Sequence, residues 1–259
     1  MDANARKVAA AFVSARKSGR SLAVYPGIAP ADLPSAYAIQ DIAIGLWGRE
    51  IGGWKVGRIG EPDASRLGSD RLVGPVFGDT IVEPTSGQAE MQVFRGGFKA
   101  AEAEFMLRLA PPQDTSLPTT NLQAADWIDE VRIGIEIASS PYPAINRDGP
   151  CVTISDHGNN AGLLLGGTVN RDRWTELASI EVSTSVDRKT VGRATVATML
   201  DGPFGAVRFL LHNLADRGIS PQKGWWISSG AITGVHEVSP GETIDATFAG
   251  IGTVTVTIA

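Results

Sequence analysis

The sequence has very little cysteine and no long apolar run, and both absences narrow the class of protein. Cys151 is the single cysteine among 259 residues, so neither an intrachain disulfide framework nor a cysteine-based zinc cluster is available. No apolar run approaches the length of a membrane-spanning helix, and the N-terminus lacks the apolar core of a signal peptide. We therefore expect a cytoplasmic protein with no membrane partner.

The sequence also lacks an excess of basic residues. Its formal net charge is -5 and it contains no basic stripe, which argues against nucleic acid as the main partner. It contains no P-loop, no strand-associated dinucleotide fingerprint, no HExxH motif and no GxSxG nucleophile elbow. Acidic side chains, one lysine and several polar loops are what remain as candidates for chemistry.

The composition that is present indicates a folded α+β chain. Hydrophobic residues make up 43% of the sequence, enough for a sizeable core, and 30 glycines with 15 prolines indicate many turns and a β-rich body. Apolar residues at helical spacing predict helices over residues 2–18 and 35–48. We expect residues 1–50 to form an N-terminal helical portion and residues 51–259 to form the β-rich main domain.

Strands dominate the predicted structure of the second part. Further elements are predicted from apolar patterning, as strands over 52–57, 91–94, 98–109, 132–138, 161–169, 225–228, 244–248 and 253–258, two strands within 176–198, and helices over 121–130 and 205–216. Residues 58–89 carry repeated turn signals, such as Gly74-Pro75, and predict a long loop. Such loops in compact chains are often lids or substrate loops.

The strand predicted over residues 98–109 carries two acids on one face. Ala103, Phe105 and Leu107 alternate toward the core, which places Glu102 and Glu104 together on the opposite face. Neighbouring buried carboxylates repel unless they are paired or bound to a cation. Mg²⁺ and similar hard cations take carboxylate oxygens, although a solvated strand face would also carry two glutamates.

A third acid stands on the strand predicted over residues 132–138. Ile133, Ile135 and Ile137 share one face, and Glu136 projects from the other. Its flanking residues on that face, Gly134 and Ala138, leave room around a carboxylate or relieve packing. Three carboxylates from two strands would suit Mg²⁺ or Mn²⁺.

Other candidate groups are one lysine and two polar segments. Lys55 lies on a short strand flanked by glycines and is either a solvent-facing charge, which its pattern alone favours, or a partly desolvated amine suited to proton transfer. Asp156 and His157 immediately precede a strand, where they could reach a site; a lone loop histidine is more often solvated. Small residues after Ser228 allow close backbone approach to a ligand.

A series of short motifs then resembles a known family. The motifs, in chain order, are Ser35-Ala-Tyr-Ala-Ile-Gln40, Trp54-Lys-Val-Gly57, Phe77-Gly-Asp79, Ala101-Glu-Ala-Glu-Phe105, Ile135-Glu-Ile137, Ser229-Gly-Ala231, Pro240-Gly-Glu242 and Gly250-Ile-Gly-Thr-Val254. Together they resemble the 2-keto-4-pentenoate hydratase and 4-oxalocrotonate decarboxylase branch of the fumarylacetoacetate hydrolase superfamily. The resemblance extends from about residue 30 to the end of the chain.

The resemblance implies a fold, a cofactor and a set of site residues. It implies a mixed β-roll of the fumarylacetoacetate hydrolase type with a smaller N-terminal helical portion, and Mg²⁺ or Mn²⁺ as cofactor. The implied site residues are the metal ligands Glu102, Glu104 and Glu136, the catalytic residues Lys55 and Asp79, and the substrate-binding residues Ser229, Gly230, Ala231 and Asp156.

The implied activity is that of a lyase in the degradation of aromatic compounds. A hydratase would add water to a 2-hydroxy-2,4-dienoate to give a 4-hydroxy-2-ketoacid. The alternatives are a 4-oxalocrotonate-type decarboxylase, an acylpyruvate C–C hydrolase and a non-catalytic ketoacid-binding partner subunit. The resemblance also implies a homo-oligomer that would associate with a decarboxylase or hydratase of the same pathway.

Several residues depart from the family pattern near the expected pocket. Arg58 stands where leucine is common, Ser229 where threonine is usual, and Asp156-His157 where Asp-Asn is usual. The first histidine in the chain is His157, which weighs against hydrolysis, because the hydrolytic relatives use a histidine early in the chain to activate water. These departures bear on the identity of the substrate.

Overall fold

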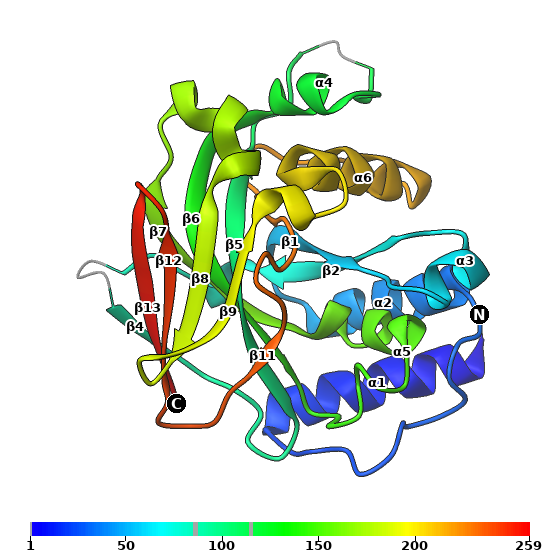
Figure 1. The fold of residues 1–259 in the computed structure, drawn as a ribbon. Helices are drawn as coiled ribbons and strands as arrows, with labels where there is room; N and C mark the ends of the chain where they lie inside the picture. Colours follow the sequence, from blue (N-terminus) through cyan, green and yellow to red (C-terminus); the bar gives the residue numbers. More distant parts are fainter. Residues whose placement is uncertain (1, 85–87, 114–115) are drawn as a thin grey trace.

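The structure of the protein, a computed structural model, describes residues 2–84, 88–113 and 116–259, and β-sheets form its centre (Figure 1). The larger sheet has the order β2-β1-β10-β5-β6-β7-β3, with β11 paired to β5. Its strands are β1 (Ile51–Arg58), β2 (Arg71–Phe77), β3 (Ile81–Val82), β5 (Phe98–Leu109), β6 (Ile128–Ser140), β7 (Asn160–Thr168), β10 (Trp226–Ser228) and β11 (His236–Glu237).

A second sheet packs against the middle of the first. Its order is β4-β13-β12-β8-β9. Its strands are β4 (Gln88–Met91), β8 (Glu181–Val186), β9 (Lys189–Thr195), β12 (Thr243–Phe248) and β13 (Gly252–Ile258). The apolar face of β5 points into the space between the sheets, where the rings of Phe105 and Phe248 lie 5.2 Å apart. The opposite face of β5 carries the glutamates toward the helical side of the molecule.

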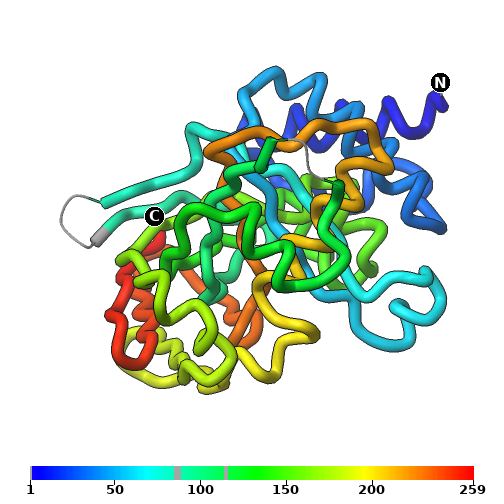
Figure 2. Tube along the Cα trace, turned by 90° about the horizontal axis from the view of Figure 1, so that it is seen from above, coloured from blue at the N-terminus to red at the C-terminus, as the bar shows by residue number. Residues whose placement is uncertain are grey.

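Most of the helices lie on the side of β1 and β2, away from the second sheet, and a short one lies above β5 and β6 (Figure 1). They are α1 (Ala3–Ser18), α2 (Leu33–Trp47), α3 (Asp63–Leu67), α4 (Asn121–Ala125), α5 (Pro150–Ser155) and α6 (Gly202–Asp216), with 3-10 segments η1 (Gly78–Thr80), η2 (His157–Asn159), η3 (Arg171–Ser179) and η4 (Val196–Thr198). Figure 2 shows the same separation from above, with α1 at one end and the C-terminal strands at the other.

Local signals account for the two N-terminal helices. The Asp2 side chain accepts a hydrogen bond from the Asn4 N–H and caps α1, which ends at Gly19 with a positive φ, as the sequence predicted. Helix α2 begins at Leu33, two residues before the predicted start, because the Asp32 side chain caps it. Both helices pack against the rest of the chain, and the Gln40 side chain of α2 donates to the carbonyls of Val73 and Ile154. The division at residue 50 stays a prediction.

Strand β2 is the largest departure from the prediction. It runs through the segment predicted as a loop, of which residues 85–87 lie outside the described residues, and its seven residues are all buried. The Gly74-Pro75 pair that predicted a turn lies inside the strand. Proline is tolerated there because β2 is at the edge of the sheet. Gly74 is required because a Cβ atom would lie 2.1 Å from the carbonyl oxygen of His157.

Smaller differences concern the ends of elements. The strand predicted over 91–94 instead covers residues 88–91, and the helix predicted over 121–130 ends at Ala125 because β6 begins at Ile128. The predicted irregular segment 139–160 contains α5. The predicted strand pair within 176–198 and the long strands over 98–109 and 132–138 are confirmed. Among the helices described, none combines the length and apolar character needed to cross a membrane.

Candidate active site

The glutamates of β5 and β6 meet on one face of the larger sheet. In the antiparallel pairing of these strands, Glu102 stands directly opposite Glu136, and Glu104 stands opposite Gly134. One carboxylate oxygen of each glutamate lies within 4.8 Å of the others. The backbone pairing therefore brings Glu136 next to two acids that stand more than 30 residues earlier in the chain.

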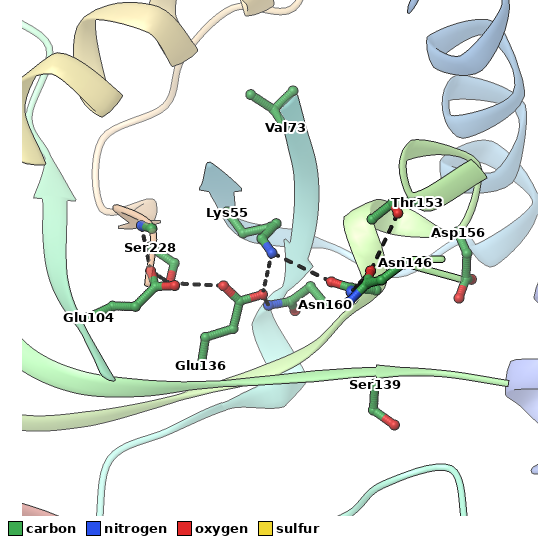
Figure 3. Close-up of polar contacts among 12 residues, drawn as sticks. Lys55, Val73, Glu104, Glu136, Ser139, Asn146, Thr153, Asp156, Asn160 and Ser228 are labelled. Atoms are coloured by element: carbon green, nitrogen blue, oxygen red, sulfur yellow. Dashed lines mark hydrogen bonds and ion pairs between the residues drawn. The ribbon is translucent and has the colours of Figure 1, made fainter. Parts of the chain in front are cut away.

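The glutamate cluster is buried and only partly satisfied by protein donors. Glu104 and Glu136 are fully buried and Glu102 is 6% exposed. The Glu104 Oε2 atom accepts hydrogen bonds from the Ser228 hydroxyl at 2.5 Å and from the Gly230 N–H at 2.7 Å, and Ser228 lies on β10 beside β5 (Figure 3). The Glu104 Oε1 atom has no hydrogen-bond partner in the part of the chain that the structure describes.

The electrostatics of the cluster favour a bound cation. Burial and the neighbouring carboxylates raise the pKa of Glu104 well above its ordinary value. Burial also raises the pKa of Glu102 to about 7, where the charge of Lys55 opposes the shift and that of Glu136 adds to it. The protein groups thus do not stabilise three negative charges here. A divalent cation would stabilise them, and an unpartnered buried oxygen fits a ligand atom for it.

Lys55 lies next to the glutamates and is buried. Its Nζ atom is 3.2 Å from Glu136 Oε1 and 3.5 Å from Asn159 Oδ1 (Figure 3). Burial alone would lower the pKa of Lys55, but the charges of Glu136, Glu102 and Glu104 outweigh it and raise the pKa above its ordinary value. The solvent-facing position favoured by the local pattern was wrong: Lys55 is 4% exposed because β2 and β10 flank β1.

A cavity of about 410 Å³ opens above Lys55 and Glu102. Its wall comes from the segment that follows β1, from α5 and the turn before it, and from the loop after β10. The residues that line it are Lys55, Gly57, Arg58, Ile59, Gly60, Glu61, Asp63, Leu72, Glu102, Asn146, Arg147, Gly149, Pro150, Thr153, Asn159, Ala231 and Val235. Gly57 keeps it open beside the lysine, because a Cβ atom there would lie 3.7 Å from Nζ and 3.3 Å from Leu72. A short substrate can therefore reach the lysine.

The strand neighbours of Glu136 have a packing role. A Cβ atom on Gly134 would lie 2.6 Å from the Met106 side chain and 2.7 Å from the Leu164 carbonyl oxygen. These contacts support close packing of the strands, rather than room for a carboxylate, as the reason for glycine at this position.

Amides on the cavity wall were missed as individual candidates. The Asn159 amide donates to Asn146 Oδ1 at 2.9 Å, and the Thr153 hydroxyl lies 3.4 Å from the same oxygen. The Asn160 amide donates to Glu136 Oε1 at 2.9 Å. The sequence signal for these amides is the polar pair Asn159-Asn160 at the start of β7, in the same segment as Asp156, the residue predicted to bind substrate.

Asp156 does not line the cavity and serves another contact. Its fully buried carboxylate is bound by Arg16 of α1, with Nε–Oδ1 and Nη2–Oδ2 distances of 2.5 and 2.9 Å. The same guanidinium donates to the carbonyls of Ser139 and Asn160. Asp156 therefore ties α1 to the sheet, and its predicted position in the substrate pocket is corrected.

His157 and Asp79 also lie apart from the lysine and the glutamates. His157 is buried against the rings of Trp47 and Phe77, and burial, together with the charge of Arg16, lowers its pKa well below the ordinary value. It is not the solvated histidine that its loop position suggested. Asp79 is about half exposed, forms an ion pair with Arg49 at 2.5 Å, and is not among the cavity residues.

Of the segment Ser229-Gly230-Ala231, only Ala231 is among the residues that line the main cavity, and all three line a smaller cavity beside it, so their role in substrate binding stays a prediction. Gly230 binds Glu104 through its N–H, and Ala231 lines the cavity wall. The Ser229 hydroxyl is buried, has no hydrogen-bond partner among the described residues, and faces a smaller cavity of about 60 Å³ on the other side of Ala231.

Comparisons with known proteins agree with this geometry. No protein-family profile matches the chain. It is 27% identical over 260 residues to a 2-keto-4-pentenoate hydratase of Paraburkholderia xenovorans (strain LB400), covering 96% of this chain and 92% of that protein. The 4-oxalocrotonate decarboxylase of Pseudomonas putida G7, solved with magnesium and adipate, superposes with a TM-score of 0.82 at 20% identity, covering 98% of this chain and 97% of that one.

A more distant solved structure shares the same core. The fumarylpyruvate hydrolase of Pseudomonas aeruginosa, solved with Mn²⁺ and pyruvate, gives a TM-score of 0.57 at 16% identity, covering 80% of this chain and 88% of that one. These relatives are enzymes, and the solved ones hold divalent cations. The predicted resemblance to the 2-keto-4-pentenoate hydratase and 4-oxalocrotonate decarboxylase branch, with its α+β fold of the fumarylacetoacetate hydrolase type, is thereby confirmed.

Proposed function

We propose that this protein is a metal-dependent hydratase, a lyase that adds water to a 2-hydroxy-2,4-dienoate through its 2-keto tautomer. The product is a 4-hydroxy-2-ketoacid. The observation that carries the proposal is the buried cluster of Glu102, Glu104 and Glu136 beside Lys55 at the base of a cavity. Similarity to a named hydratase over nearly the whole chain supports it.

The three glutamates would hold Mg²⁺ or Mn²⁺. Both ions prefer oxygen ligands, and the named decarboxylase and hydrolase were solved with magnesium and Mn²⁺, respectively. When bound, such an ion supplies Lewis acidity to the carboxylate and 2-oxygen of the ketoacid, where negative charge develops. The backbone pairing of β5 with β6 holds Glu102 and Glu136 in place before any ligand arrives.

Lys55 is our candidate for proton transfer. The carboxylates favour its ammonium form in the metal-free site, so it can donate a proton to C5 of the dienol while the 2-hydroxyl proton leaves to solvent, which gives the 2-keto-3-enoate. The resulting amine can then accept a proton from the water whose oxygen bonds to C4, and the ammonium so formed can give a proton to C3, which completes the 4-hydroxy-2-ketoacid; the amine regains a proton from solvent. Asn159, 3.5 Å from Nζ, orients the lysine toward the cavity.

Small and amide side chains form part of the cavity wall. Ala231 and Gly57 leave space for the carbon chain, and Asn146 offers a polar contact. We leave Asp79 and Asp156 out of the machinery, because Asp79 pairs with Arg49 outside the cavity and Asp156 pairs with Arg16 beneath it.

The test is a direct assay of hydration. Purified protein with Mg²⁺ is incubated with 2-hydroxypenta-2,4-dienoate, and the loss of dienol absorbance is followed with and without EDTA. We expect turnover that requires the metal and that Glu104→Gln abolishes. Absence of metal-dependent turnover would contradict the proposal.

A decarboxylase is the second candidate, and one observation favours it. Lys55 is the only proton-transferring side chain that we find next to the glutamates among the cavity residues described. Decarboxylation needs a single protonation after CO₂ leaves, whereas hydration needs both a base and an acid. Release of CO₂ from 4-oxalocrotonate, measured in parallel with dienol loss, separates the two reactions.

A further inference from the structure

Arg58 is a cation on the cavity wall that the mechanism above does not use. It ends β1, three residues after Lys55, and lines both the main cavity and the smaller one behind Ala231. No hydrogen bond or ion pair joins its guanidinium to any residue that the structure describes.

The other charges of the same wall are already engaged. The Glu61 carboxylate accepts hydrogen bonds from the Ser65 N–H and hydroxyl, and Asp63 pairs with Arg66 at 2.6 Å. Arg71, opposite Arg58 on β2, pairs with Asp201. These contacts leave Arg58 available to a ligand.

Arg147 is the other arginine of the main cavity, and its situation differs. Its side chain is 81% exposed and lies 3.4 Å from Asp148. Arg58 therefore offers the stronger unsatisfied positive charge, and Arg147 serves as the matched comparison within the same cavity.

The spacing along β1 fits a short chain with an anion at each end. Three residues of strand separate the Cα atoms of Lys55 and Arg58 by roughly 10 Å. Strand alternation directs the two side chains to opposite faces, but Arg58 is the last residue of β1 and lines the same cavity as Lys55. A ketoacid whose first carboxylate lies at the glutamate cluster would extend its remaining carbons along Gly57 toward Arg58. A guanidinium binds a carboxylate through two parallel hydrogen bonds.

We propose that Arg58 is a specificity residue that binds a second carboxylate at the far end of the substrate, so that the preferred substrate is a ketodiacid. The inference rests on the proposed function, because it places the 2-keto end at the glutamate cluster. It holds for either reaction at that end.

The test compares two ketoacids of equal chain length. Binding of 2-oxoadipate, which has a second carboxylate, and of 2-oxohexanoate, which lacks it, is measured by calorimetry on the Mg²⁺-loaded protein. We expect the wild type to bind the diacid about tenfold more tightly, the effect of one charge-assisted contact. In Arg58→Leu the ratio of the two dissociation constants falls to near one, and in Arg147→Leu it stays near the wild-type value. Added salt lowers the wild-type ratio as well, because the contact is partly exposed.

The outcomes are distinguishable. Equal affinities in the wild type, an unchanged ratio in Arg58→Leu, or the same loss in Arg147→Leu would overturn the role of Arg58 while leaving the proposed function intact. If the loaded wild type binds neither ketoacid, the proposed function fails first and the inference falls with it.

Discussion

Replacing Glu104 by glutamine separates metal binding from folding. Two full charges 4.8 Å apart repel by about 3.5 kcal/mol at an effective dielectric constant of 20. Burial, Glu136 and Glu102 raise the pKa of Glu104 well above its ordinary value, so the site without metal disfavours the charged form of this carboxyl. Glutamine is close in shape to a protonated glutamate. Its oxygen can accept from Ser228 and Gly230, and its NH₂ group can donate to a neighbouring carboxylate.

We therefore expect two different responses from the Glu104→Gln variant. Without metal, its free energy of unfolding should lie within about 1 kcal/mol of the wild-type value, because the shape is kept and the buried site disfavours the charge that glutamine lacks. With Mg²⁺ at a hundred times its dissociation constant, the wild type should gain about 2.7 kcal/mol. That gain corresponds to roughly 5–10 °C in the melting temperature of a chain of this size. The variant should gain almost nothing.

The assay is thermal unfolding followed by circular dichroism, with EDTA and across a Mg²⁺ titration. Glu237→Gln is the matched control, because its side chain is exposed on β11 and distant from the cluster in the sequence. It should shift with Mg²⁺ as the wild type does. An equal Mg²⁺ shift in Glu104→Gln would refute the assignment of the metal site. A loss of more than about 3 kcal/mol without metal would show that the carboxylate is a structural requirement.

Three further predictions follow from the same geometry. Lys55→Met should lower kcat at least about a hundredfold while keeping the Mg²⁺-induced rise in melting temperature; loss of that rise would indicate a structural role. Because burial raises the pKa of Glu102 from 4.5 to about 7, the EDTA-treated protein should lose up to about 3 kcal/mol of unfolding free energy between pH 4.5 and 7, as the unfolded chain releases the proton first. Urea midpoints that stay flat over this range, or rise, would contradict it. Arg16→Met should lower the free energy of unfolding by about 3–5 kcal/mol, since Asp156 would remain buried without its partner. Urea unfolding of the double variant that also carries Asp156→Asn should show that part of this free energy is recovered. Losses that simply add in the double variant would contradict the pairing.

The glutamate cluster could be predicted from the sequence because strand geometry is periodic. Alternation placed Glu102 and Glu104 on one face and Glu136 on the polar face of another strand, and the structure has both strands as expected. The register that sets Glu102 opposite Glu136 could not be read from spacing alone. It depends on the pairing of residues across an intervening loop and helix.

The burial of Lys55 could not be predicted locally, because the cause lies elsewhere in the chain. Strand β10 pairs with β1 in parallel, and Lys55 is opposite Ser228, a residue far along the sequence. The same limit applies to the segment before β7. Asp156 and Asn159 are three residues apart and both polar, and only the position of Arg16 on α1 decides which of them turns away from the cavity.

Strand β2 was missed for a different physical reason. Glycine and proline usually interrupt strands, so Gly74-Pro75 was read as a turn. The edge position of β2 removes the penalty for proline, and the close approach of His157 makes glycine necessary. Both conditions arise from tertiary packing. Neither leaves a trace in the local pattern.

The origin of the site residues has a consequence for altering this protein. Lys55 and the three glutamates stand on β1, β5 and β6, and the pairing of β5 with β6, and of β1 with β5 through β10, fixes their spacing. The cavity wall comes instead from the connecting segments around residues 58–63 and 146–153. Sequence drift or laboratory evolution can therefore change the residues of the cavity wall, and with them the carbon chain that the cavity accepts, without displacing Lys55 and the three glutamates. A library aimed at new substrates would randomise those two segments and hold the three strands constant.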